Sequence, residues 1–166
     1  MENILSNINN VFGFWDSESN SQISDIQCIQ IKLWAKSILF FNPESSIWIF
    51  TKRNVIPPDL IILNDVHIIY FNDVKEILSG TPLENYKIPD RICKPELSDI
   101  IRLSLLYKYS GSWIDIDDIC VRKIPNNKNV IGCFLWENKK TATYWGSTFN
   151  LVEGSVISSE IKNFHI

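Results

Sequence analysis

Short apolar runs typical of strands alternate with amphipathic runs typical of helices over the first two thirds of the chain. Strand-like segments lie at 10–15, 46–51, 66–71 and 112–117, and helix-like segments lie at about 24–41, 74–80 and 95–109. Strands that alternate with helices in this way usually lie parallel in one sheet. The order therefore predicts an α/β sandwich with a mostly parallel sheet flanked by helices.

Local signals mark where these elements begin and end. Ser24 and Gln27 have the spacing of a capping box at the start of the first long helix, and Asn42 followed by Pro43 predicts its end. Pro95 suits the first turn of the last helix, and Gly111 is expected to close it. Beyond residue 118 the apolar runs continue without helical segments, which predicts antiparallel strands added after the acidic segment.

Length and composition limit the class of protein. With 166 residues, of which 45% are hydrophobic and 21% charged, the sequence predicts one globular domain over 1–166. The net charge of −3 and the scattered lysines and arginines argue against a nucleic-acid partner. The apolar runs are too short to span a membrane.

The cysteines and the N-terminus bear on the compartment. The four cysteines form no CxxC pair, and the first residues lack the basic and long apolar regions of a signal peptide. The cysteine spacing predicts buried free thiols in a reducing compartment. Together with the N-terminal sequence, it predicts a cytoplasmic protein.

The stretch SDIIRLSLLYKYSGSWIDIDD (98–118) places carboxylates in a run that otherwise reads as core. If the strand extends through it, Asp115 and Asp117 point to one face and Asp118 to the other, with the first two Cα atoms roughly 6.5–7 Å apart. Like charges this close repel unless a cation lies between them, and Mg²⁺ or Mn²⁺ accepts carboxylate oxygens. The alternative is a solvated edge strand whose acids block aggregation.

The preceding helix carries a second pair of charges. Asp99 and Arg102 share a face at spacing i, i+3 on a helix that is otherwise apolar. They could form an ordinary surface ion pair, worth about 0–1 kcal/mol. Their place shortly before the acidic strand instead favours polar groups that point into a cleft.

This segment resembles the signature of glycosyltransferases with a DXD-containing sugar-binding region, a group that includes relatives of capsular polysaccharide synthesis enzymes and the clostridial glucosylating toxins. The matching positions are Ser98, Asp99, Arg102, Tyr109, Gly111, Trp113, Asp115 and Asp117. FGFWDSE and LWAKSILFFNPESSIWIFT are similar in order and spacing to the N-terminal part of the family. The resemblance covers about residues 10–125.

The resemblance implies a GT-A-type nucleotide-binding fold. It also implies metal-dependent transfer of a sugar from a nucleotide-sugar donor, UDP- or GDP-linked, to a glycan, lipid or protein acceptor, as in polysaccharide biosynthesis. Retention of configuration is expected, and we identify no catalytic base. By similarity, Asp115 and Asp117 hold Mn²⁺ or Mg²⁺ against the diphosphate, while Asp99 and Arg102 bind the donor sugar or phosphate.

The resemblance also suggests contacts to the nucleoside. Trp15, with Phe14 beside it, is expected to stack on the base, and Ser98 and Trp113 are expected near base and ribose. Two departures stand out: Ser110 replaces the first glycine of a Y-G-G turn, and family members usually carry more sequence after the motif. They keep open a non-catalytic module that binds a nucleotide sugar or a glycan.

Overall fold

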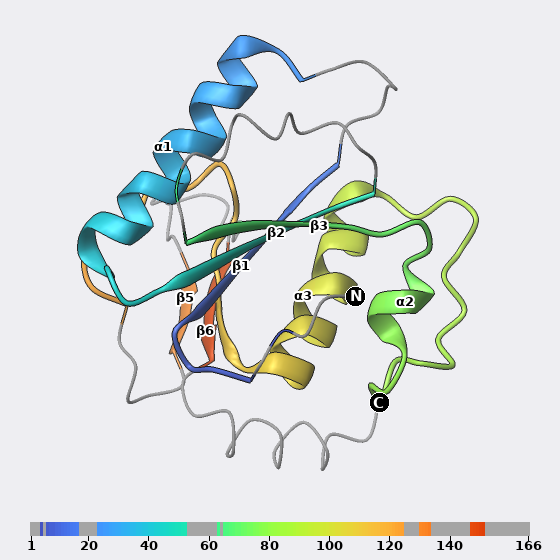
Figure 1. The fold of residues 1–166 in the computed structure, drawn as a ribbon. Coiled ribbons are helices and arrows are strands. Elements are labelled where there is room, and N and C mark those ends of the chain that lie inside the picture. The colour runs from blue at the N-terminus through green and yellow to red at the C-terminus, as the bar shows by residue number, and fades with distance from the viewer. Residues whose placement is uncertain are drawn as a thin grey trace, which may run out of the picture.

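A computed structural model gives the fold of the chain. It describes residues 4, 6–16, 23–52, 63, 65–124, 130–133 and 147–151, the last two segments by their backbone. The strands are β1 (Asn10–Trp15), β2 (Ser46–Thr51), β3 (Val66–Tyr70), β4 (Gly111–Trp113), β5 (Val130–Cys133) and β6 (Ser147–Leu151). They form one sheet in the order β3-β2-β1-β4-β6-β5 (Figure 1).

The direction of the strands agrees with the expected class. β1 pairs in parallel with β2 and with β4, and β2 pairs in parallel with β3. β6 runs antiparallel to both β4 and β5. The prediction of a mostly parallel α/β sheet with antiparallel strands added after the acidic segment is confirmed.

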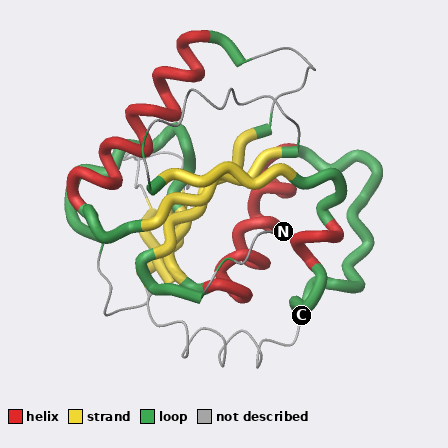
Figure 2. Tube along the Cα trace, in the orientation of Figure 1, coloured by secondary structure: helices red, strands yellow, loops and turns green. Residues whose placement is uncertain are grey.

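The helices are α1 (Asp25–Phe41), the short α2 (Lys75–Leu78) and α3 (Lys94–Tyr109). α1 covers one face of the sheet, and α2 and α3 cover the other (Figures 1 and 2). Ser24 and Gln27 form the predicted capping box, and Pro95 lies in the first turn of α3. Within the described part of the chain, no helix is long and apolar enough to cross a membrane.

Each face of the sheet has its own core. The α1-side cluster consists of Val11, Ile23, Ile31, Trp34, Ala35, Ile38, Ile47, Ile49, Val66, Ile114 and Ile116. The α3-side cluster consists of Ile4, Phe12, Phe50, Ile69, Phe71, Val74, Ile77, Leu78, Leu97, Ile101, Leu105, Leu106 and Trp113. Successive residues of a strand contribute to opposite clusters, as the alternation of side chains in a strand requires.

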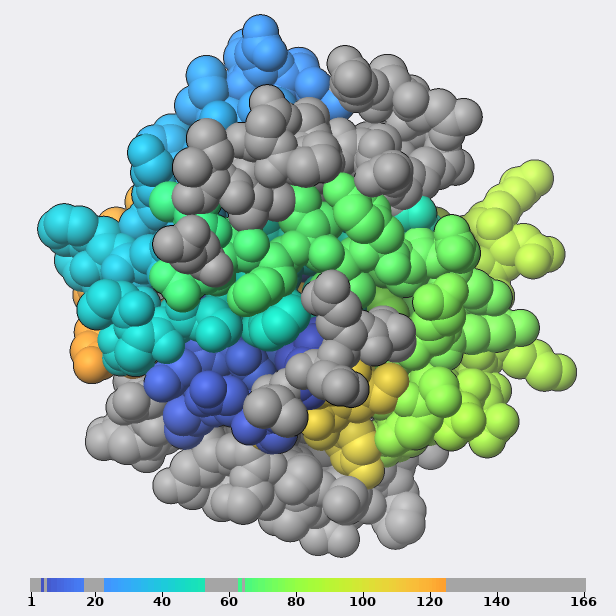
Figure 3. Space-filling view, viewed as in Figure 1, coloured from blue at the N-terminus to red at the C-terminus, as the bar shows by residue number. Residues whose placement is uncertain are grey.

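The junction between α3 and β4 is tightly constrained. Gly111 has φ +111°, and a Cβ there would overlap the carbonyl oxygen of Asn10 on β1. Ser110 before it has φ 56° and ψ 177°, a backbone region that glycine adopts far more readily than other residues. The backbone N–H of Asn7 donates to the carbonyl of Tyr109 at 3.1 Å, so the N-terminal segment (blue) lies beside the end of α3 (gold in Figure 3).

Two expectations about local structure are wrong. β4 ends at Trp113, so the acidic residues do not continue the strand; instead the N–H of Asp118 donates to the carbonyl of Asp115 at 3.0 Å and closes a turn. The free thiols of Cys28 and Cys120 are partly exposed and that of Cys93 is exposed, not buried. The side chain of Cys133 lies outside the described residues.

Candidate functional site

The carboxyl ends of β1 and β4 meet at the centre of the sheet. The two strands are parallel neighbours, with Phe12 opposite Trp113. From β1 the chain continues to α1 on one face, whereas β4 is reached from α3 on the other face. Ligands of open α/β sheets bind at such a switch point, outside the carboxyl ends of the strands.

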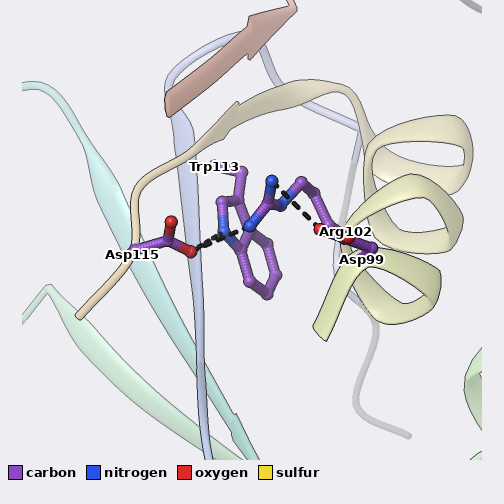
Figure 4. A network of polar contacts seen from close by, with 4 residues as sticks. All are labelled: Asp99, Arg102, Trp113 and Asp115. Atoms are coloured by element: carbon purple, nitrogen blue, oxygen red, sulfur yellow. Dashed lines mark hydrogen bonds and ion pairs between the residues drawn. The ribbon is translucent and has the colours of Figure 1, made fainter. Parts of the chain in front are cut away.

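A network of three side chains lies just beyond β4 (Figure 4). Oδ1 of Asp115 accepts hydrogen bonds from Nη2 of Arg102 at 2.9 Å and from Nε1 of Trp113 at 2.7 Å. The guanidinium carbon of Arg102 lies 5.2 Å from the centroid of the Trp113 ring. The side chains of Arg102 and Trp113 are buried, and that of Asp115 is 25% exposed. Two buried donors therefore hold one partly exposed carboxylate.

The network extends to the surface through Asp99. Nη1 of Arg102 lies 3.3 Å from Oδ1 of Asp99, whose side chain is 62% exposed. One turn of α3 separates the two residues, so the helix itself sets their spacing. The structure thus brings Asp99, Arg102, Trp113 and Asp115 together, with Arg102 between the two acids.

Asp117 and Ser98 are close to this group in sequence, and none of the polar contacts described above joins either side chain to it. Asp117 is exposed on the turn that follows Asp115, and Ser98 is half-buried beside Asp99 on α3. The described residues contain no group of three His, Cys, Asp or Glu side chains that could hold a metal ion. Within the described part of the chain, the acidic segment therefore offers Asp115 and Asp117 as candidate ligands.

On the β1 side of the site, the two aromatic residues Phe14 and Trp15 pack on different faces of the sheet. Trp15 is half-buried against the α1-side cluster, whereas Phe14 packs in the α3-side cluster, its ring centroid 6.2 Å from that of Phe71. The two aromatic residues therefore lie on opposite faces of the sheet and cannot stack together on one base. Nε1 of Trp15 is buried and has no hydrogen-bond partner among the described residues.

An ion pair that the sequence reading missed lies next to Trp15. Nζ of Lys52 is 3.6 Å from Oδ2 of Asp16. The register of β1 and β2 pairs Trp15 with Thr51, so Asp16 and Lys52 are the next residues on two paired strands. In the sequence, this contact is indicated only by position: Asp16 directly follows the strand-like run 10–15, and Lys52 directly follows the run 46–51. Lys52 also lines a hollow of about 640 Å³ at the carboxyl ends of β2 and β3.

The acidic segment lies within the region that a known protein family matches. The family described as glycosyltransferase sugar-binding region containing DXD motif matches residues 28–134, a range that includes Asp115-Ile116-Asp117. No curated protein matches the sequence.

Two solved structures are similar to the chain. One is the PaToxG glycosyltransferase, with a TM-score of 0.52 and 19% identity over 93% of this chain and 58% of that chain. The other is galactosyltransferase LgtC in complex with donor and acceptor sugar analogs, with a TM-score of 0.40 and 17% identity over 93% of this chain and 64% of that chain. The chain thus spans less than two thirds of either protein, and the likeness to PaToxG concerns the fold. Because the family match covers more than half of the sequence, the chain belongs to the glycosyltransferase family whose sugar-binding region contains a DXD motif.

Proposed function

We propose that the chain binds a nucleotide-sugar donor at the carboxyl ends of β1 and β4 and transfers the sugar to a glycan, lipid or protein acceptor. Membership of the family supports sugar transfer in general. The observation that carries the finer proposal is Asp115, whose carboxylate is held at this edge by Arg102 and Trp113. We further propose a single domain over 1–166 that acts in the cytoplasm, in polysaccharide biosynthesis.

The acidic residues fit a divalent cation. Both hydrogen bonds that the described residues donate to Asp115 go to Oδ1, so Oδ2 has no described partner, and the neighbouring Asp117 is exposed. Mg²⁺ and Mn²⁺ are commonly held by one or two carboxylates together with water and substrate phosphates. Such an ion, when bound, would neutralise the charge that develops on the departing nucleoside diphosphate.

The remaining residues divide the other tasks. The exposed carboxylate of Asp99 can accept hydrogen bonds from sugar hydroxyls. Arg102 is buried and already spans Asp99 and Asp115, which favours a role in orienting both acids over a direct contact with the sugar. Trp15, half-buried at the end of β1, is the proposed stacking partner of the base, with Phe14 next to it in sequence. A UDP- or GDP-linked sugar and retention of configuration remain part of the proposal.

The substitution of Ser110 for glycine no longer argues for a non-catalytic binding module. Ser110 replaces a glycine of the family pattern, but it adopts the positive φ that glycine accepts most readily. The turn into β4 is therefore formed in spite of the substitution. Consumption of the donor, measured as release of nucleoside diphosphate, separates a transferase from a binding module.

The first experiment is a thermal-shift panel of UDP-, GDP-, dTDP- and CDP-sugars, each with Mn²⁺ and with a chelator. A ligand present at 100 times its dissociation constant stabilises a protein by about 2.7 kcal/mol, which is several degrees for a chain of this size. We expect one nucleotide to give such a shift, and we expect the chelator and Asp117→Asn to abolish it.

Asp118→Asn is the matched control, because it removes the same charge one residue later. It is expected to retain the shift. If no nucleotide shifts the transition, or if the shift survives the chelator and Asp117→Asn, the proposed metal and donor site is wrong.

A further inference from the structure

Trp113 contacts the candidate metal ligand, although its ring cannot be reached from solvent. The side chain is 1% exposed and belongs to the α3-side cluster. Its Nε1 donates to Oδ1 of Asp115 at 2.7 Å, which is short for an N–H···O bond and typical of a charged acceptor. The sequence predicted that Trp113 lies near base and ribose, but its burial favours an indirect role.

Both donors to Asp115 engage the same oxygen. Nη2 of Arg102 and Nε1 of Trp113 converge on Oδ1 from different elements, α3 and β4. A carboxylate oxygen has two lone-pair sites, so these two donors occupy Oδ1. Oδ2 has no partner among the described residues, and Figure 4 shows it pointing away from both donors.

Trp113 is the more rigid of the two donors. Its ring is fixed by the packed core, whereas a guanidinium is carried on a long side chain with several rotatable bonds. The residue also lies only two positions before Asp115, at the last residue of β4. A bond from this fixed ring sets the direction of a carboxylate that lies beyond the end of the strand.

We propose that Trp113 is a positioning residue, which holds Oδ1 of Asp115 so that Oδ2 faces the divalent cation. This inference rests on the proposed function, because it assumes that Asp115 is a metal ligand. Partners that orient metal ligands usually contribute about 10–100-fold to metal affinity. Because Arg102 still holds the same oxygen when the indole is lost, we expect the lower end of this range, about tenfold.

The test compares Trp113→Phe with Trp34→Phe. Both variants replace a buried indole by a smaller ring, but Trp34 lies in the α1-side cluster and its Nε1 has no partner among the described residues. Mn²⁺ is titrated in the presence of UDP, and separately of GDP, and the free ion is measured by electron paramagnetic resonance. We expect the dissociation constant of Mn²⁺ to rise about tenfold in Trp113→Phe and to stay within twofold in Trp34→Phe.

A second measurement tests the contact without metal. The indole ¹⁵N–¹H signal of Trp113, identified by its loss in Trp113→Phe, is expected to move upfield in Asp115→Ala because the bond to Oδ1 is gone. If Trp113→Phe folds poorly, the signal is assigned through the backbone instead. The wild type and Asp115→Ala can then still be compared. An unmoved signal would overturn the inference.

The outcomes separate the two proposals. If the wild type binds Mn²⁺ and Asp117→Asn does not, but Trp113→Phe binds as tightly as Trp34→Phe, the positioning role is wrong and the proposed function stands. If the wild type binds no Mn²⁺ with either nucleotide, the metal site fails and the positioning role fails with it.

Discussion

Two ion pairs lie at the carboxyl edge of the sheet, and they differ in length and in the burial of the cation. Arg102 and Asp115, beyond β4, are 2.9 Å apart with side chains 5% and 25% exposed. Lys52 and Asp16, beyond β2 and β1, are 3.6 Å apart with side chains 32% and 18% exposed. The first pair also has an indole donor, whereas the second has none among the contacts described above.

The two ion pairs divide the site into a β4 side and a β1 side that are held differently. On the β4 side, two buried donors hold the carboxylate, because Arg102 and Trp113 both donate to Asp115. The β1 side has a longer ion pair and an indole N–H without a described partner. Chemistry that needs a fixed geometry belongs on the first side. On the second side, the described contacts hold the charged groups less closely.

Arg102→Met gives the largest expected effect on stability. It removes a buried cation and leaves Asp115 with the indole as its remaining described partner. Breaking a buried pair costs about 3–5 kcal/mol, and the partial exposure of Asp115 places the expected loss near the lower limit, about 3 kcal/mol. Urea unfolding followed by circular dichroism measures it. A loss below about 1 kcal/mol would show that this pair is no more important than a surface pair.

Ser110→Gly tests the strain at the start of β4 and is expected to stabilise the protein. The backbone of Ser110 costs about 1–3 kcal/mol in its present region, and glycine removes this cost at the expense of a more flexible unfolded chain. The net gain is about 1 kcal/mol, or roughly 2–4 °C in Tm. Ser79→Gly is the control, because Ser79 has φ −53° and gains nothing from glycine. Equal effects of both variants would contradict the strain.

Lys52→Met gives the smallest expected effect. The pair with Asp16 is long and partly hydrated, and such pairs contribute about 0–1 kcal/mol. We expect the free energy of unfolding to change by less than about 0.5 kcal/mol, measured under the same conditions as Arg102→Met. A loss comparable to that of Arg102→Met would remove the contrast between the two sides of the site.

Most of the fold could be predicted because its signals are local. The capping residues of α1, the proline of α3 and the apolar runs of the strands each act within a few residues, so spacing alone reveals them. The proximity of Asp99, Arg102 and the acidic segment followed from the same reasoning. The sequence did not predict the contact between Trp113 and Asp115, because this contact depends on β4 ending at Trp113.

Part of the arrangement at the end of β1 follows from strand geometry alone. Phe14 and Trp15 are successive residues of one strand, and successive side chains point to opposite faces. The structure accordingly places Phe14 against Phe71 and Trp15 in the opposite cluster. The Lys52–Asp16 pair, in contrast, required the register of β1 and β2, which no single segment contains.

The pairing of β1 with β4 has a consequence for how the protein folds. Val11 and Ser112 are register partners although they lie roughly a hundred residues apart, so this contact closes the longest loop among the parallel pairings. Such distant contacts form slowly, because the chain loses the entropy of closing the loop before other contacts compensate for that loss. We therefore expect the ligand-binding edge to assemble late on the folding pathway. A bound donor would then act mainly by slowing unfolding, with little influence on how quickly the chain reaches its native state.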